Sequence, residues 1–215
     1  MTATVFFPGL GADSSLARFH PVVDGEAIWI EWPDPIPGDW DGFVEAMRRQ
    51  IPIDRELRYV GISFGGLAAI ATARVLPPAG GVHLIGSLVD RTELRPLFRL
   101  LLGMVNWIPT RLFDLRLMPD FLVRHFFGIR DPGHLVLFHA MAARLPAKSV
   151  KALCKLVALW VPPETMESRR IHGASDRIIR APTRNVLLLD GGHLISMTHA
   201  EQVNRWLAEE PAPLP

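Results

Sequence analysis

Short, mainly apolar runs alternate with longer segments of helical periodicity, and this alternation constrains the fold more than any other feature of the sequence. Five runs occupy residues 4–7, 27–32, 58–62, 82–86 and 185–189, and residues 168–171, Ser-Arg-Arg-Ile, are a weak candidate for a further strand between the last two. Continuous apolar runs of about five residues are typical of strands covered on both faces. Helical patterns follow at residues 39–51, 64–76 and 200–210. The sequence therefore predicts an α/β fold, with a mostly parallel sheet of about six strands and helices on both faces.

Residues 91–163 interrupt this rhythm. They contain no clear strand pattern, and their Leu, Phe, Met and Trp residues recur at helical spacings between scattered prolines. We interpret this interval as a cap of short helices inserted into one α/β core, which comprises residues 1–90 and 164–215. A chain of 215 residues is long enough to bury such a core without disulfides or metals.

The composition narrows the cellular setting. Cys154 is the single cysteine, which excludes an internal disulfide and fits a reducing compartment. The first ten residues lack the basic and apolar regions of a secretory signal. No stretch approaches the ~20 apolar residues that a membrane helix needs. We therefore expect a cytoplasmic protein.

A serine motif lies at the junction between one predicted strand and one predicted helix. Residues 61–65 read Gly-Ile-Ser-Phe-Gly, directly after the run at 58–62 and at the start of an Ala-rich helical pattern. A serine in this strand–turn–helix context projects from the carboxyl edge of the sheet. The helix N-terminus adds partial positive charge near a developing oxyanion. The alternative is that Ser63 only caps the helix.

Two further polar segments each follow a predicted strand. Residues 171–176 read Ile-His-Gly-Ala-Ser-Asp, and residues 191–193 read Gly-Gly-His. With the serine motif, the order along the chain is serine, acid, histidine, and in this order the sequence resembles the α/β-hydrolase superfamily. The resemblance covers nearly the whole chain outside the cap, and it points to small esterase- or thioesterase-like members. It implies Ser63 as nucleophile, Asp176 as acid and His193 as base, with no cofactor and no metal.

Other residues compete for these roles. Asp90 also follows a strand, where some family members place the acid. His199 competes with His193, but it lies inside the predicted last helix. His83 lies within a strand and is interpreted as a core residue, and His172 as a structural or supporting neighbour of the acid. The histidines of the cap have no ligand-like partners, so no metal site is expected among them; they are His125, His134 and His139.

The segment after the first strand has a predicted role in the same chemistry. Residues 7–13 read Phe-Pro-Gly-Leu-Gly-Ala-Asp. By resemblance they correspond to the family's oxyanion loop, His-Gly-x-Gly, with Pro8 in place of the histidine. The backbone N–H groups of Leu10 and Phe64 would then face the oxyanion. Because this loop already follows the first strand, the family's two leading strands are expected to be absent.

The same segment supports a rival interpretation. Gly9, Gly11 and Ser14 follow a strand, and Glu31 stands 20 residues after Gly11, which imitates the fingerprint of a nucleotide-binding Rossmann-like protein. However, Ser14 replaces the glycine or alanine that allows close helix packing. This interpretation also leaves the serine, acid and histidine segments unexplained.

The predicted cap bears on the substrate. Some of its large apolar side chains should line a pocket above Ser63, where an acyl or aryl group would fit. The interval holds 11 Lys and Arg against 4 Asp and Glu. Three explanations of this positive excess stay open: it attracts an anionic substrate, it attracts an anionic membrane surface, or it is only a solvated cationic face. Nucleic-acid binding is not expected, because the basic residues are dispersed among apolar ones. The large apolar residues are Phe98, Met104, Trp107, Phe113, Met118, Phe121, Phe126, Phe127, Phe138, Met141 and Trp160.

The function predicted from these residues is hydrolysis of a carboxylic ester or thioester through an acyl-enzyme on Ser63. The substrate would be a small molecule. A serine at this position argues against the family's dehalogenases and epoxide hydrolases, which use aspartate. Two alternatives stay open besides the nucleotide-binding one: a C–C hydrolase or lyase that uses the same triad, and a non-catalytic hydrolase-like protein that binds a small molecule. The sequence does not indicate the oligomeric state.

Overall fold

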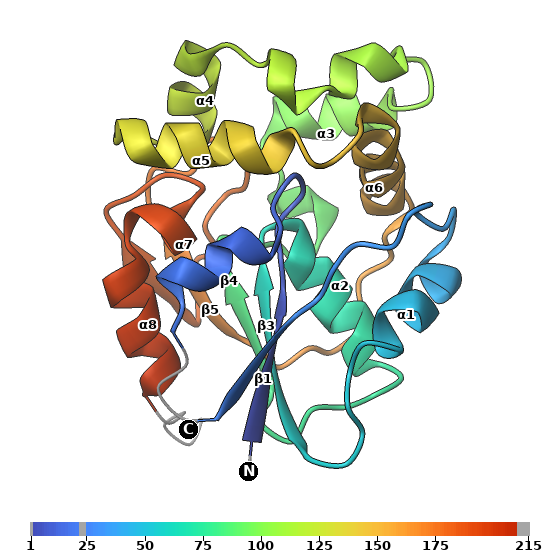
Figure 1. The fold of residues 1–215 in the computed structure, drawn as a ribbon, viewed down its shortest axis with the longest axis vertical. Coiled ribbons are helices and arrows are strands. Elements are labelled where there is room, and N and C mark those ends of the chain that lie inside the picture. The colour runs from blue at the N-terminus through green and yellow to red at the C-terminus, as the bar shows by residue number, and fades with distance from the viewer. Residues whose placement is uncertain (1, 22–24, 210–215) are drawn as a thin grey trace.

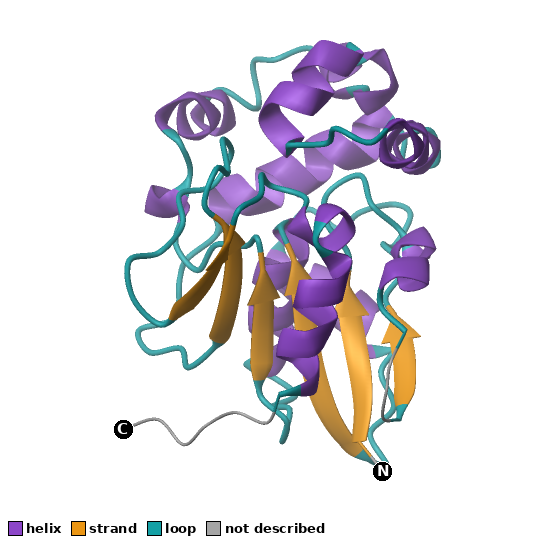
Figure 2. Ribbon diagram, turned by 90° about the vertical axis from the view of Figure 1, so that its left-hand side faces the viewer, coloured by secondary structure: helices purple, strands orange, loops and turns teal. Residues whose placement is uncertain are grey.

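The computed structural model describes residues 2–21 and 25–209, and a six-stranded sheet with only parallel pairings forms its centre (Figures 1 and 2). The strand order is β2-β1-β3-β4-β5-β6. This confirms the predicted minimal sheet. The strands are β1 (Thr2–Phe7), β2 (Glu26–Trp29), β3 (Glu56–Ile62), β4 (Val82–Ile85), β5 (Arg169–Gly173) and β6 (Val186–Leu189).

The second strand is shorter than predicted and ends at Trp29 instead of residue 32. Ile30 still donates its backbone N–H to Phe6 O, which extends the strand by one bond. At Glu31 the side chain of Gln50 binds both the backbone N–H and the backbone C=O, at 2.9 Å each. The amide of Gln50 therefore satisfies the groups that a sheet neighbour would otherwise pair.

Helices cover both faces of the sheet, because neighbouring strand residues point to opposite sides. Val5 and Tyr59 belong to the apolar cluster with α1 and α2, whereas Phe6 and Val60 belong to the cluster with η1, α7 and α8. The predicted helix at 200–210 ends at Ala208, and residue 210 lies outside the described residues. The bounds are α1 (Trp40–Arg48), α2 (Phe64–Ala73), η1 (Ser14–Phe19), α7 (Ile195–Thr198) and α8 (Ala200–Ala208).

The interval 91–163, all of which is described, contains helices and no strand. Its helices lie across the carboxyl ends of the strands (Figures 1 and 2). Parallel strands all present their carboxyl ends on this side, so the loops that follow β1, β3, β5 and β6 meet beneath the cap. The elements are η2 (Arg91–Glu93), α3 (Pro96–Gly103), η3 (Thr110–Phe113), η4 (Leu115–Leu117), α4 (Asp120–Phe127), α5 (Pro132–Ala142) and α6 (Ala147–Leu159).

The last helix of this interval packs on the core as well as on the cap. Leu153, Leu156 and Trp160 join the same apolar cluster as α1 and α2. Trp40 donates its indole N–H to Leu156 O at 2.9 Å. The boundary predicted at residue 163 therefore follows a helix that contacts both parts, and α6 fixes one end of the cap to the core.

Candidate active site

Ser63 occupies a strained turn between β3 and α2. Its backbone angles are φ 53° and ψ −120°, in a region that residues other than glycine rarely adopt. The flanking glycines allow the turn to pack closely. A Cβ built on Gly65 would lie 1.9 Å from Phe7 O, and one on Gly61 would lie 2.4 Å from the Gly66 Cα. The turn holds Ser63 at the carboxyl edge of the sheet, as the motif predicts.

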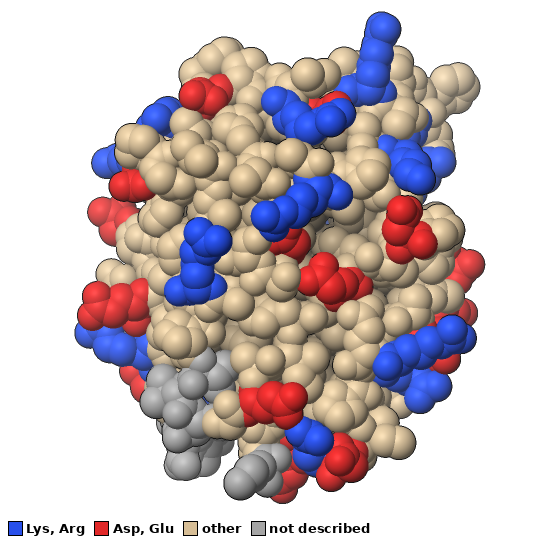
Figure 3. Space-filling view, viewed as in Figure 1, with Lys and Arg blue, Asp and Glu red and all other residues tan. Residues whose placement is uncertain are grey.

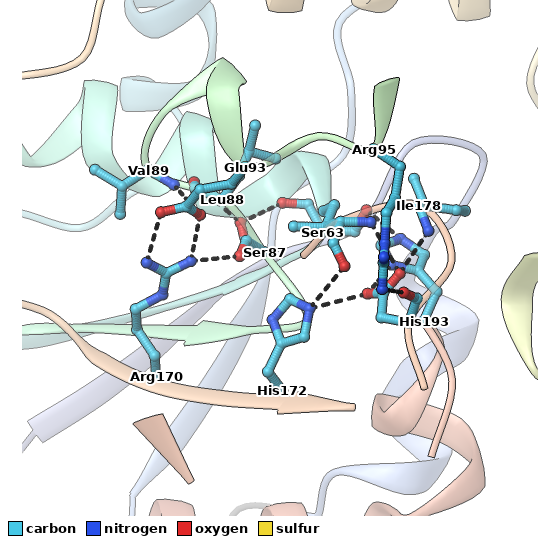
Figure 4. A network of polar contacts seen from close by, with 12 residues as sticks. Ser63, Ser87, Leu88, Val89, Glu93, Arg95, Arg170, His172, Ile178 and His193 are labelled. Carbon is cyan, nitrogen blue, oxygen red and sulfur yellow. Dashed lines mark hydrogen bonds and ion pairs between the residues drawn. The ribbon is translucent and has the colours of Figure 1, made fainter. Parts of the chain in front are cut away.

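The side chain of Ser63 points to His193 (Figure 4). The Ser63 hydroxyl oxygen lies 2.8 Å from His193 Nε2. His193 is buried on the loop after β6, and the backbone N–H of Leu194 donates to Phe127 O at 3.1 Å. The imidazole is therefore held between the sheet edge and the end of cap helix α4.

Asp176 completes a chain of three side chains. Its Oδ2 accepts from His193 Nδ1 at 2.7 Å, and its Oδ1 accepts the backbone N–H groups of Ile178 and Ile179 at 2.8 and 2.9 Å. Burial opposes ionisation, but the charge of His193 and hydrogen bonds from His172, His193 and Ile179 hold the pKa of Asp176 well below its usual range. The carboxylate is thus kept charged, with a protonated Nδ1 as its partner.

The neighbours of this chain take different places. His172 is buried, and its Nε2 lies 3.1 Å from the same Asp176 Oδ2, so it supports the carboxylate. Asp90 instead caps η2, where its Oδ1 accepts from Thr92 N at 2.6 Å. The alternative acid is therefore not hydrogen-bonded to His193, and Asp176 is.

A polar network that no sequence motif predicted joins the serine turn to the start of the cap (Figure 4). The Ser87 hydroxyl donates to Ser63 O at 2.6 Å. Arg170 donates to both carboxylate oxygens of Glu93, at 2.6 and 3.0 Å, and to Ser87 O at 2.9 Å. Ser87 lies two residues after the end of β4, and this place at the carboxyl end of a strand is the one signal that a motif search could have used.

The cap is anchored to the acid loop by backbone pairing. Leu94 and Ile179 form an antiparallel bridge, and Arg95 N donates to Ile178 O at 2.9 Å. The guanidinium of Arg95 also donates to Asp176 O at 2.9 Å. The entrance of the cap therefore fixes the loop that carries the acid.

The predicted oxyanion loop lies against Ser63. Gly9, Leu10, Gly11 and Ala12 line the same small cavity as Ser63. The backbone N–H groups of Leu10 and Phe64 make no hydrogen bond to another described residue. These two donors are consequently free to bind an oxyanion.

The cavity at Ser63 is apolar and small, with a volume of about 30 Å³. Phe127, Phe138 and Met141 of the cap line it, as predicted for some of the large apolar residues of the cap. Other members of that set face solvent instead, above all Trp107 and Phe121. A larger hollow of about 710 Å³ is lined by Gly191, Gly192 and His199 and does not include Ser63, so the small cavity is the one that contains the candidate nucleophile.

No protein-family model matches the sequence, and no curated protein matches it either. Solved structures do. A lipase-esterase related protein from Clostridium acetobutylicum is 14% identical, with a TM-score of 0.69, over 98% of this chain and 94% of that chain. An esterase from Exiguobacterium antarcticum is 12% identical, with a TM-score of 0.66, over 96% and 90%. The chain has the α/β-hydrolase fold. A 2-hydroxy-6-oxo-6-phenylhexa-2,4-dienoate hydrolase from Rhodococcus is 17% identical, with a TM-score of 0.67, over 97% and 90%.

Within this α/β-hydrolase fold, the nucleotide-binding fingerprint does not form. The segment after β1 continues into the six-residue 3₁₀ helix η1, whereas the fingerprint needs an α-helix whose N-terminus holds the pyrophosphate. Gly9 and Gly11 instead line the cavity at Ser63. The rival interpretation is therefore wrong about this loop.

Other histidines of the α/β-hydrolase fold are not part of the hydrogen-bonded set Ser63, His193 and Asp176. His83 is a buried residue of β4, as expected. His199 lies at the N-cap position of α8, which begins at Ala200, and so it is not inside the last helix as expected. Its side chain makes no capping hydrogen bond, and its Nδ1 lies 2.8 Å from the Thr198 hydroxyl oxygen. His125 contacts Arg177. Among residues 2–21 and 25–209, no helix is long and apolar enough to cross a bilayer.

Proposed function

We propose that the chain is a serine hydrolase that cleaves a carboxylic ester or thioester through an acyl-enzyme on Ser63. One observation carries the proposal: the hydrogen-bonded chain from Ser63 Oγ to His193 Nε2 and from His193 Nδ1 to Asp176 Oδ2, at 2.8 and 2.7 Å. Both distances are within the range for a nucleophile and its general base.

In the first half-reaction, Ser63 Oγ attacks the acyl carbon while its proton passes to His193 Nε2. The charge that develops on the carbonyl oxygen faces the free N–H groups of Leu10 and Phe64. Asp176 stabilises the imidazolium and keeps Nδ1 protonated. His193 then returns the proton to the departing alkoxide or thiolate, and the acyl group stays on Ser63.

In the second half-reaction, water takes the place of the alcohol or thiol. His193 accepts a proton from the water as its oxygen attacks the acyl carbon, and it returns the proton to Ser63 Oγ as the acid leaves. These steps need no metal or cofactor. The apolar walls of the cavity, Phe127, Phe138 and Met141, suit the acyl side of a substrate.

The direct test is labelling with a fluorophosphonate probe, which reacts with an activated serine. We expect covalent labelling of the parent at Ser63 and none of the Ser63→Ala variant, together with loss of ester hydrolysis. Circular dichroism of the variant checks that it folds. A folded parent that neither reacts with the probe nor cleaves any ester or thioester would support the non-catalytic binding protein instead.

A second candidate is a C–C hydrolase or lyase that uses the same triad. The structurally similar Rhodococcus enzyme favours it, because the compound in that enzyme's name contains neither an ester nor a thioester. A panel of acyl esters, acyl thioesters and vinylogous diketones separates the candidates. Probe labelling with turnover of the diketones alone would select the second one.

A further inference from the structure

Exposed apolar side chains gather in one part of the cap, residues 97–121, which we call the cap tip. Eight of the fifteen large apolar side chains exposed among the described residues belong to it. The most exposed are Trp107, Leu117, Leu112 and Phe121, at 86%, 72%, 69% and 67%. Single exposed apolar side chains are ordinary, but such a concentration marks an interaction site. Figure 1 places this segment at the end of the molecule away from both termini.

The unbalanced charge of the cap tip is positive. Its three arginines, Arg99, Arg111 and Arg116, outnumber its two carboxylates by one. Asp114 pairs with Arg116 at 2.5 Å, and Asp120 lies 3.0 Å from His139 Nε2. Arg99 and Arg111 are exposed and have no carboxylate within 4 Å among the described residues. Figure 3 shows that Lys and Arg predominate over the cap on the face drawn.

The exposed apolar side chains and the positive charge of the cap tip together indicate which kind of partner binds there. A second copy of the chain would cover the apolar side chains, but a two-fold contact sets the same patch against itself. Both patches would then carry the same net positive charge, and their unpaired arginines would repel each other across the contact. An anionic bilayer meets both demands, because Trp and Leu insert at the headgroup boundary while Arg pairs with the headgroups.

We propose that the cap tip docks on the surface of a phospholipid bilayer that carries anionic headgroups. Trp107, Leu112 and Leu117 enter the interface, and Arg99 and Arg111 contact phosphate groups. The docking goes beyond the proposed hydrolysis and does not depend on it, because neither Ser63 nor His193 belongs to the surface.

Co-sedimentation with vesicles tests the docking without any substrate. We expect the parent chain to pellet with vesicles of phosphatidylcholine and phosphatidylglycerol, and to stay in the supernatant with phosphatidylcholine alone. The double variant Arg99→Gln/Arg111→Gln should bind about 25-fold more weakly, since each arginine near an anionic surface contributes about fivefold. Trp107→Ser/Leu117→Ser should weaken binding by on the order of 100-fold, since two large apolar side chains no longer enter the interface. High salt should weaken the binding of the parent.

Matched control variants distinguish binding through the cap tip from two general effects, the net charge of the protein and the number of its exposed apolar side chains. Arg18→Gln/Arg184→Gln changes the net charge equally at exposed positions outside the cap. Ile53→Ser/Val75→Ser removes two exposed apolar side chains at the far end of the sheet. Both controls should bind vesicles as the parent does, and thermal unfolding checks that all variants fold.

Three results would overturn the proposal. The parent could remain in the supernatant with both vesicle types, or pellet equally with both. The control variants could lose as much binding as the cap-tip variants. The parent could sediment as a dimer in solution and become a monomer on Trp107→Ser/Leu117→Ser, which would assign the cap tip to a second copy. Probe labelling at Ser63 is independent of all three.

Discussion

Two apolar helices of similar length, α2 in the core and α3 in the cap, differ in how far their residues are buried. Nine of the ten residues of α2 are buried, whereas no residue of α3 is. The difference follows from side-chain size and from the neighbours. α2 carries Gly and Ala next to the sheet, so its backbone approaches β1 and β4 closely, as the short distances at Gly65 and Gly66 show. α3 carries Leu and Phe, but it has no sheet beneath it.

The same contrast separates the candidate site from the cap that covers it. Ser63, Asp176 and His193 lie on loops that follow strands β3, β5 and β6, and hydrogen bonds hold each of the three side chains. The cap contacts these turns through a few groups, such as Leu94 and Phe127. The cavity at Ser63, of about 30 Å³, is too small for an acyl chain, so the proposed reaction requires cap side chains to move before a substrate binds.

The largest expected effect lies in the core. Asp176→Asn should lower turnover by about 10⁴-fold, because an amide no longer stabilises the imidazolium or fixes the tautomer of His193. The measurement is kcat with a reactive acyl ester. Asp90→Asn is the matched control and should leave kcat within about twofold, because Asp90 only caps η2. If Asp90→Asn gave the larger loss, the acid assignment would fail.

A pair of leucine truncations measures the contrast between the two helices directly. Leu67 of α2 is fully buried, and Leu67→Ala should lower the free energy of unfolding by about 2–5 kcal/mol. Leu100 of α3 is 62% exposed, and Leu100→Ala should change it by less than about 0.5 kcal/mol. Urea unfolding followed by circular dichroism gives both values. Equal losses at the two sites would mean that α3 is buried against something in solution.

The same contrast explains what could be predicted from the sequence. Most of the strands were predictable because they contain short apolar runs next to turn residues, as in β1 and β4. β5, Arg-Arg-Ile-His-Gly, has no such run and gave only a weak signal. The arrangement of the candidate site was predictable where a motif and its strand coincide, as at Ser63, His193 and Asp176. The place of each of these residues follows from local sequence alone, because each lies just after a strand whose position the sequence predicts.

The rest depends on contacts between distant segments. Arg170 and Glu93 are 77 residues apart, and nothing local in either segment indicates that they pair. The exposure of Trp107 was not predictable either, because an apolar residue in a helical pattern is equally consistent with burial. The boundary of β2 depends on Gln50, whose side chain replaces the sheet neighbour at Glu31.

Two helical glycines give a smaller but sharper comparison. Gly65 lies in α2, and an added Cβ would meet Phe7 O at 1.9 Å and Pro8 O at 2.4 Å, both backbone atoms. Gly65→Ala should therefore lower the free energy of unfolding by about 1–3 kcal/mol. Gly103 ends α3, and nothing lies within 4 Å of an added Cβ. Gly103→Ala should be neutral or stabilise by up to about 1 kcal/mol. Thermal unfolding of the two variants measures both changes in stability. A destabilised Gly103→Ala would contradict the open packing of α3.

The smallest effect concerns the pH dependence of the core. Burial, together with the charges of Arg58 and Arg169, lowers the pKa of His83 to about 3. In the unfolded chain this imidazole takes up its proton near pH 6.5, so between the two values the unfolded state binds more protons and stability falls as the pH falls. We expect the free energy of unfolding to be about 2 kcal/mol lower at pH 5 than at pH 7.5 from this group alone. The lowered pKa of Asp176 adds a loss only below about pH 4.

Replacing the imidazole of His83 tests whether this residue causes the pH dependence. The quantity compared is the change in the free energy of unfolding with pH, not its value at one pH. His83→Leu removes the titrating group at a position of β4 that packs edge-on against Trp206, so some stability is lost at every pH. The slope between pH 7.5 and pH 5 should nevertheless flatten by about 2 kcal/mol. His125→Gln, at an exposed position of α4, serves as the control that removes a cap imidazole without touching the sheet. An unchanged slope in His83→Leu, measured by urea unfolding, would place the acid sensitivity outside β4, and a flattened slope in His125→Gln would move it into the cap.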